Sequence, residues 1–146
     1  MAELLNIEDG LQAAVFEALA SSADVRQHVA QRVFDDVPAQ HIKPGDSSLF
    51  PYVQIGDDEI LDDSNGCGVA FECFVTVHVW SREPGKPQAK LIGAAVRAAL
   101  DTPLSVGGFV CRGAESHAQS ARYFRDPDGL TTHGVLTFRY VFDVAE

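Results

Sequence analysis

The stretch that decides the fold is Val69-Ala70-Phe71-Glu72-Cys73-Phe74-Val75-Thr76-Val77-His78-Val79-Trp80. Every odd-numbered side chain in it is apolar, whereas the even positions mix polar and aromatic residues. A period of two with one uniformly apolar face predicts a strand packed on a core. After a Pro/Gly breaker at residues 83–87 the period changes to that of a helix over residues 86–100.

The bulk properties are those of one ordinary globular domain. The chain has 146 residues, 46% hydrophobic and 22% charged, which is enough to bury a sizeable core. No apolar run is long enough to span a membrane, and the N-terminus lacks a signal-peptide pattern. We therefore expect assembly in the cytoplasm and reduced thiols at the three cysteines, Cys67, Cys73 and Cys111.

The formal charge of −10 is unevenly distributed along the chain. Residues 1–73 carry 14 acidic and 3 basic side chains, whereas residues 74–146 carry 7 acidic and 8 basic ones. So acidic a chain repels phosphate backbones, which excludes a reader of DNA or RNA sequence. The asymmetry is compatible with a head-to-tail contact between copies, and equally with a solvated acidic surface.

The remaining elements follow from local signals. Asn6 is a good N-cap for an N-terminal helix whose apolar stripe runs from Leu11 to Leu19, and a second short helix follows. Strands are predicted at residues 32–35, 50–55, 109–112, 121–125 and 134–144, and a type I turn at residues 126–129. We predict an α+β fold, with an antiparallel sheet of about four strands and helices packed on one face, as a single domain over residues 1–146. Residues 39–49 and 56–68 are expected to be loops or an extended arm.

No constellation of residues points to catalysis, a metal or a cofactor. Cys73 and His78 are five apart on one strand, so their side chains point to opposite faces. Asp126 and Asp128 begin like a calcium loop, but the later ligands are absent. There is no nucleophile motif and no phosphate-binding glycine loop. We expect neither an enzyme nor a cofactor.

One strand face could bind a partner. His78 and Trp80 lie on the even-numbered face of the central strand. A helix of the same chain could cover this face; left open, it would be an apolar patch of the kind that marks partner surfaces.

The order of segments resembles a known family. The most telling pieces are residues 52–56 (Tyr-Val-Gln-Ile-Gly), residues 78–81 (His-Val-Trp-Ser), and the hairpin formed by residues 126–129 (Asp-Pro-Asp-Gly) and 133–136 (His-Gly-Val-Leu). Together with the N-terminal helix and the Ala-rich helix, they resemble the small tail terminator, or tail completion, proteins of long-tailed phages, prophages and gene transfer agents.

This resemblance implies a structural role in virion assembly. Members of that family form a ring, typically of six copies, that caps the tail tube, ends its growth and joins the tail to the head connector. The implied partners are other copies of the chain, the tail tube protein and the head–tail connector or adaptor protein, with DNA passing through the ring without sequence-specific binding. The implied place is the head–tail joint of a virion or phage-like particle. The alternative is another head–tail connector or adaptor, or a tail tube component, of the same particle.

Nine residues are candidates for interfaces in such an assembly. The acidic side chains would face the channel or a neighbouring copy, Arg122 and Arg125 would contact the neighbour, and His78 and Trp80 lie on the possible open face. The acidic candidates are Asp57, Asp58, Glu59, Asp62 and Asp63. Solvated surface is the competing interpretation for the charged residues.

Overall fold

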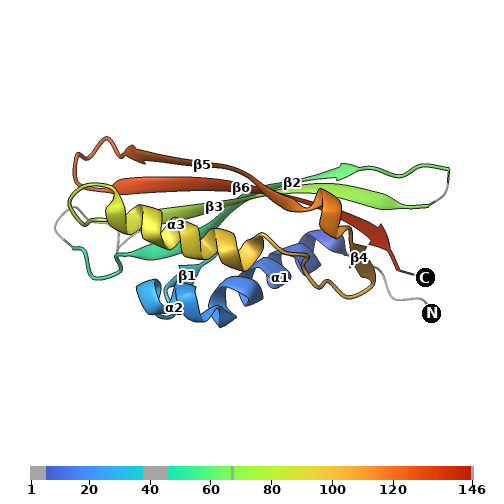
Figure 1. Cartoon of the computed structure of the whole chain (residues 1–146), viewed down its shortest axis with the longest axis horizontal. Coiled ribbons are helices and arrows are strands. Elements are labelled where there is room, and N and C mark those ends of the chain that lie inside the picture. The colour runs from blue at the N-terminus through green and yellow to red at the C-terminus, as the bar shows by residue number, and fades with distance from the viewer. Residues whose placement is uncertain (1–5, 38–45, 67, 146) are drawn as a thin grey trace.

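The computed structural model describes residues 6–37, 46–66 and 68–145. Three helices cover one face of a twisted six-stranded sheet (Figure 1). The helices are α1 (Ile7–Ser21), α2 (Ala23–Val29) and α3 (Pro87–Leu100). The strands are β1 (Val33–Phe34), β2 (Tyr52–Asp62), β3 (Ala70–Ser81), β4 (Phe109–Cys111), β5 (His117–Arg125) and β6 (Thr132–Val144). The predicted α+β class is confirmed.

The sheet is antiparallel except at one edge. Its order is β1-β2-β3-β6-β4, with β5 also pairing to β6, and only the two-residue β1 runs parallel to its neighbour β2. The sheet thus has six strands where about four were expected, because the short β1 and β4 pair at its margins. Strands β3 and β6 pair in an unbroken register from Ala70 opposite Asp143 to Ser81 opposite Thr132.

Each helix begins at a local signal, and the one at Asn6 is the one expected. Asn6 caps α1, since its side-chain oxygen accepts a hydrogen bond from the Asp9 N–H at 3.1 Å. Ser22 caps α2 in the same way through the Val25 N–H at 3.3 Å. Pro87 occupies the first turn of α3, where its missing N–H costs no hydrogen bond.

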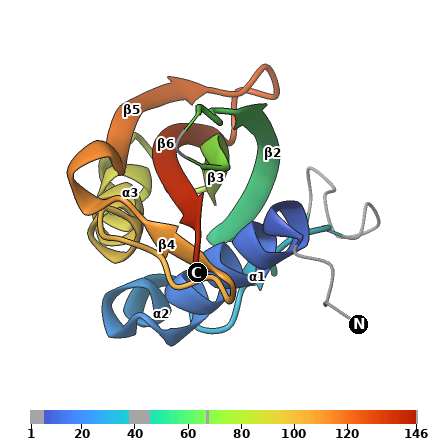
Figure 2. The same cartoon turned by 90° about the vertical axis from the view of Figure 1, so that its right-hand side faces the viewer.

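The core lies between the helices and one face of the sheet, which we call the helix face. Cys73, Val75, Val77 and Val79 of β3 are buried there, as the odd-numbered pattern predicts. Leu136, Phe138, Tyr140 and Phe142 of β6 continue the layer. Figure 2 shows all three helices on this side of the strongly twisted sheet. The other face of the sheet carries no helix, and we call it the open face.

The structure corrects one boundary. Residues 56–62, expected within a loop or arm, form the second half of β2, where Asp58–Asp62 pair with β3. A bulge between Ile55 and Asp58 interrupts the alternation. After it, Ile60 and Leu61 place one apolar side chain on each face among exposed acids, so the sequence shows no period of two. The hairpin of β2 and β3 therefore projects past α1 (Figure 1). Of the expected loop at residues 39–49, residues 39–45 lie outside the described part of the chain, as does Cys67.

Candidate assembly interface

The acidic candidates lie together on the β2–β3 hairpin. Asp57 lies in the bulge of β2, Asp58 and Glu59 follow it, and all three are exposed. Asp62 and Asp63 lie at the turn; Asp62 accepts a hydrogen bond from the Ser64 N–H at 2.8 Å. Hydrogen bonding from Ser64 lowers the pKa of the Asp62 carboxyl. The hairpin thus presents a concentrated negative charge in solvent.

The outer edge of this part of β2 is unpaired. Strand β1 pairs only with Val53 and Gln54, so residues 55–62 have no strand on their second side among the described residues. Asp57, Asp58 and Glu59 make no salt bridge to any described residue; Asp63 approaches Arg112, at 3.9 Å. Backbone hydrogen-bonding groups and uncompensated carboxylates therefore share one exposed edge.

The open face carries a cluster of rings that we call the aromatic–histidine cluster: Tyr52, His78, Trp80, Phe124 and His133. The His133 ring stacks on Trp80 with centroids 3.7 Å apart, and Phe124 meets it edge-on at 4.9 Å. Trp80 also donates its indole N–H to the Gln54 side chain at 3.3 Å. These contacts join β2, β3, β6 and β5 across the open face.

The two histidines of the cluster are in direct contact. Nδ1 of His78 lies 2.7 Å from Nε2 of His133, so one of these nitrogens donates and the other accepts. Burial lowers the pKa of His78, and burial together with the charge of His78 lowers the pKa of His133 to about 4. Gly56 leaves room for the pair, because a Cβ there would lie 2.4 Å from the His78 ring. Both imidazoles are therefore neutral at pH 7.

The predicted arginines lie on β5, at the opposite edge of the sheet from the acids. Arg122 lies over the Phe124 ring at 5.7 Å, and Arg125 donates to the Gly129 carbonyl at 3.0 Å. Strand β5 pairs only with β6, so its second side is also unpaired among the described residues. Neither β5 nor the adjacent α3 contains an acidic residue, and α3 adds Lys90 and Arg97.

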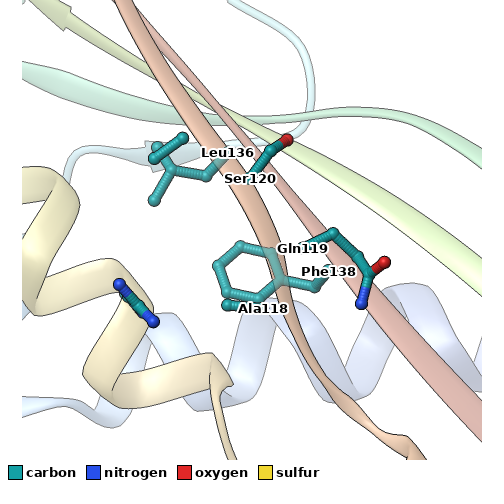
Figure 3. Close-up of a pocket in the computed structure, with 7 residues that line it drawn as sticks. Ala118, Gln119, Ser120, Leu136 and Phe138 are labelled. Carbon is teal, nitrogen blue, oxygen red and sulfur yellow. The ribbon is translucent and has the colours of Figure 1, made fainter.

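A small pocket opens between α3 and this β5 edge (Figure 3). Leu136 and Phe138 form its apolar wall, Gln119 and Ser120 of β5 form its rim, and the exposed Arg97 lines it from α3. A bulge between Ala118 and Ser120 shapes the rim by shifting the register against β6. The pocket therefore combines the positive charge of Arg97 with the apolar surface of Leu136 and Phe138.

The structure thus separates the nine predicted residues into three places. The acids occupy one sheet edge, the arginines occupy the other, and His78 and Trp80 lie on the open face between them. Sequence reasoning missed Tyr52, Phe124, His133 and Arg97. The expected pairing of the two long strands could have placed His133 near the central strand, but only the register of β3 and β6 sets it opposite Trp80.

The residues weighed as metal ligands lie apart in the structure. Cys73 is buried on the helix face, whereas His78 lies on the open face. In the described ranges no three His, Cys, Asp or Glu side chains converge as metal ligands would. Asp128 accepts hydrogen bonds from the Leu130 and Thr131 N–H groups within the β5–β6 turn. No helix in the described part of the chain has the length and apolar character of a membrane span.

Comparisons with known proteins give a consistent picture. A structure described as the virion of a native gene transfer agent particle contains a chain similar to this one, with 26% identity, a TM-score of 0.81, and coverage of 96% of this chain and 99% of that one. The gp17 protein of bacteriophage SPP1 shares the fold at 24% identity and a TM-score of 0.52, over 94% of this chain and 91% of its own. No curated protein matched the sequence. The sequence model of the family described as tail completion protein gp17 matches residues 13–143, so this chain belongs to that family of tail-associated structural proteins of virions.

Proposed function

We propose that the protein forms a ring that caps the finished tail tube, stops its growth and provides the surface to which the head connector binds. The observation that carries this proposal is the family match over residues 13–143. Assembly takes place in the host cytoplasm, and the product is located at the head–tail joint. The protein acts as a structural part and catalyses no reaction.

The two sheet edges support a ring. A cyclic assembly needs two different, complementary surfaces on each copy, because each contact is heterologous. Here the β2 edge carries Asp57, Asp58 and Glu59, whereas the β5 edge carries Arg122 and Arg125. Six copies is the number that the resemblance implies, and it remains a prediction.

The overall charge supports passage of DNA through the ring. A net charge of −10 repels phosphates, so DNA would move past the protein without being held. The acids of the β2–β3 hairpin, which lie outside the helix layer (Figure 1), either face the channel or contact the neighbouring copy. Charge reversal of three of them should change ring assembly or DNA passage, and unchanged particles would exclude both roles.

The alternative is a connector, adaptor or tube component of the same particle. The gene transfer agent structure is that of a whole virion, so likeness to one of its chains leaves this alternative open. Partner choice distinguishes the two: a terminator binds the end of the tail tube, whereas an adaptor binds the portal side of the head.

The decisive experiment is electron microscopy of particles from cells in which this gene alone is deleted. Overlong tubes, or tails that fail to join heads, are expected, and a plasmid copy of the gene should restore normal particles. Normal particles in normal numbers would contradict the proposal. Tails of normal length that lack only the head-side connection would favour the adaptor.

A further inference from the structure

The unpaired edges of β2 and β5 match each other in more than charge. The free edge of β2 spans residues 55–62, and β5 offers His117–Arg125, so the two edges have similar lengths. Unpaired strand edges readily accept a further strand through their backbone N–H and C=O groups.

The strand directions permit such pairing. β2 is antiparallel to β3, β3 to β6, and β6 to β5, so β5 runs opposite to β2. Rotation about a ring axis that lies along the strands preserves both strand direction and face. A neighbouring copy would therefore place its β2 antiparallel to this β5, and the alternation would continue from copy to copy.

The charges also match face by face. On the open face the β2 edge presents Glu59, which pairs with Phe74, and the β5 edge presents Arg122, which pairs with Val135. On the helix face β2 presents Asp58 and Asp62, opposite Val75 and Phe71. On the helix face of the β5 edge, Arg125 lies opposite Thr132, and Arg97 of α3 lines the pocket beside β5.

None of these charges is compensated within the copy. Glu59, Asp58, Arg97 and Arg122 make no ion pair with any residue that the structure describes. Next to Asp58 and Asp62 on the helix face of the β2 edge lies Ile60, a partly buried apolar side chain opposite Cys73. The α3–β5 pocket has the complementary properties, because Leu136 and Phe138 are apolar and Arg97 is positively charged.

We propose that the free edge of β2 in one copy pairs antiparallel with β5 of the next copy, with an acidic side chain of β2 bound to Arg97 in the α3–β5 pocket. This inference rests on the proposed ring, for which it names the contact between copies. The sheet then runs continuously from one copy to the next. Coulomb attraction between the edges selects this pairing over edge contacts of like charge.

A reciprocal charge exchange tests the contact. Three variants are needed: D58R/E59R on the β2 edge, R97E/R122E on the β5 side, whose arginines share the faces of these two acids, and the four-fold variant that combines them. All six copies carry the same change, so either double variant opposes like charges at every contact. The four-fold variant restores attraction with reversed sign. A matched control, E17R/D24R, makes the same charge change at exposed positions of α1 and α2.

Each variant is expressed in cells that lack the chromosomal gene, and joined particles are counted by electron microscopy. Each double variant should lower the number of joined particles at least about tenfold relative to wild type, since like-charge juxtaposition at an interface is costly. The four-fold variant should recover most of the loss, and the control should behave as wild type. Circular dichroism and thermal melting of each purified variant verify that it folds.

Two results would overturn the contact. Either both double variants support wild-type numbers of joined particles, or the four-fold variant is as defective as the doubles although it folds. Native mass spectrometry of an equimolar mixture of the two double variants adds a test in solution: complexes should contain both variants in preference to one. Because rescue reports a contact between copies wherever the ring is located, a failure here is distinct from the normal gene-deletion particles that would contradict the proposed function.

Discussion

Nδ1 of His78 on β3 lies 2.7 Å from Nε2 of His133 on β6, and the His133 ring is stacked on Trp80 at 3.7 Å. Two imidazolium ions at this separation would repel each other, and partial burial among the neighbouring rings leaves them less water for solvation. The contact is therefore favourable only while at least one of the two imidazoles is neutral.

The pH dependence of folding should report this pair. The pKa of His133 is about 4 in the folded protein, below the ordinary value of about 6.5 for an unfolded histidine. Between these values the unfolded state binds more protons, so stability is complete above about pH 6.5 and falls as the pH drops towards 4. H133Q should flatten this loss in urea denaturation from pH 7.5 to 4.5, whereas H117Q, at an exposed position, should leave it unchanged. An unaltered pH slope in H133Q would show that the pair does not titrate in this way.

Tyr123 of β5 packs against two glycines, and the tighter contact is with α3. A Cβ at Gly93 would lie 1.8 Å from the Tyr123 hydroxyl oxygen. G93A should therefore destabilise the protein by about 1–2 kcal/mol, as overpacking exceeds the helix propensity that alanine gains.

The cause can be separated by a double-mutant cycle. In the Y123F background most of the clash is absent, so G93A should cost clearly less there, as measured by urea denaturation. G107A is the control, because a Cβ at Gly107 has no neighbour within 4 Å. Equal costs of G93A in both backgrounds would contradict the packing explanation.

The buried Tyr140 hydroxyl ties β6 to the end of α3. It donates a hydrogen bond to the Leu100 carbonyl at 2.5 Å, and burial raises the pKa of this phenol. Y140F should lower the free energy of unfolding by about 1–2 kcal/mol, since it leaves a buried carbonyl without its partner. Y123F should cost less, because no hydrogen bond of the Tyr123 hydroxyl is present in the described part of the chain. A neutral Y140F would show that water replaces the lost donor.

Cys73 should resist thiol reagents while the protein is folded. Burial, reinforced by the charges of Asp58, Cys111 and Glu72, raises the pKa of its thiol to about 12, and the thiolate is the reactive form. Iodoacetamide at pH 8 followed by mass mapping should modify Cys111, which is partly exposed, well before Cys73. In urea the two should react alike, and rapid native labelling of Cys73 would show that the core opens.

Long periodic segments were predictable because their patterns are local. The alternation of residues 69–80 gave β3, the apolar stripe gave α3, and Asn6 marked the start of α1, since each depends only on neighbours along the chain. The second half of β2 was not predictable. Most of its residues are exposed and follow no period of two, so pairing with β3 is what makes them a strand.

The candidate site was foreseen in part for the same reason. Charge can be counted along a sequence, so the acids and Arg122 and Arg125 could be named as candidates for contacts. That the acids and the arginines lie on two opposite edges of the sheet could not be predicted, because edge position follows from strand order. Arg97 was overlooked since a lone arginine on a helix carries no signal until β5 lies beside it.

By itself the sequence determined the fold class, the buried side chains of the long strands, the acidic character, and the family resemblance that the match over residues 13–143 confirms. These properties are sums over local patterns of polarity and shape. Tertiary structure alone decided which strands are left with free edges, which charges lie on each edge, and that His133 meets His78. Such relations depend on register and topology, which arise from pairing residues far apart in the chain.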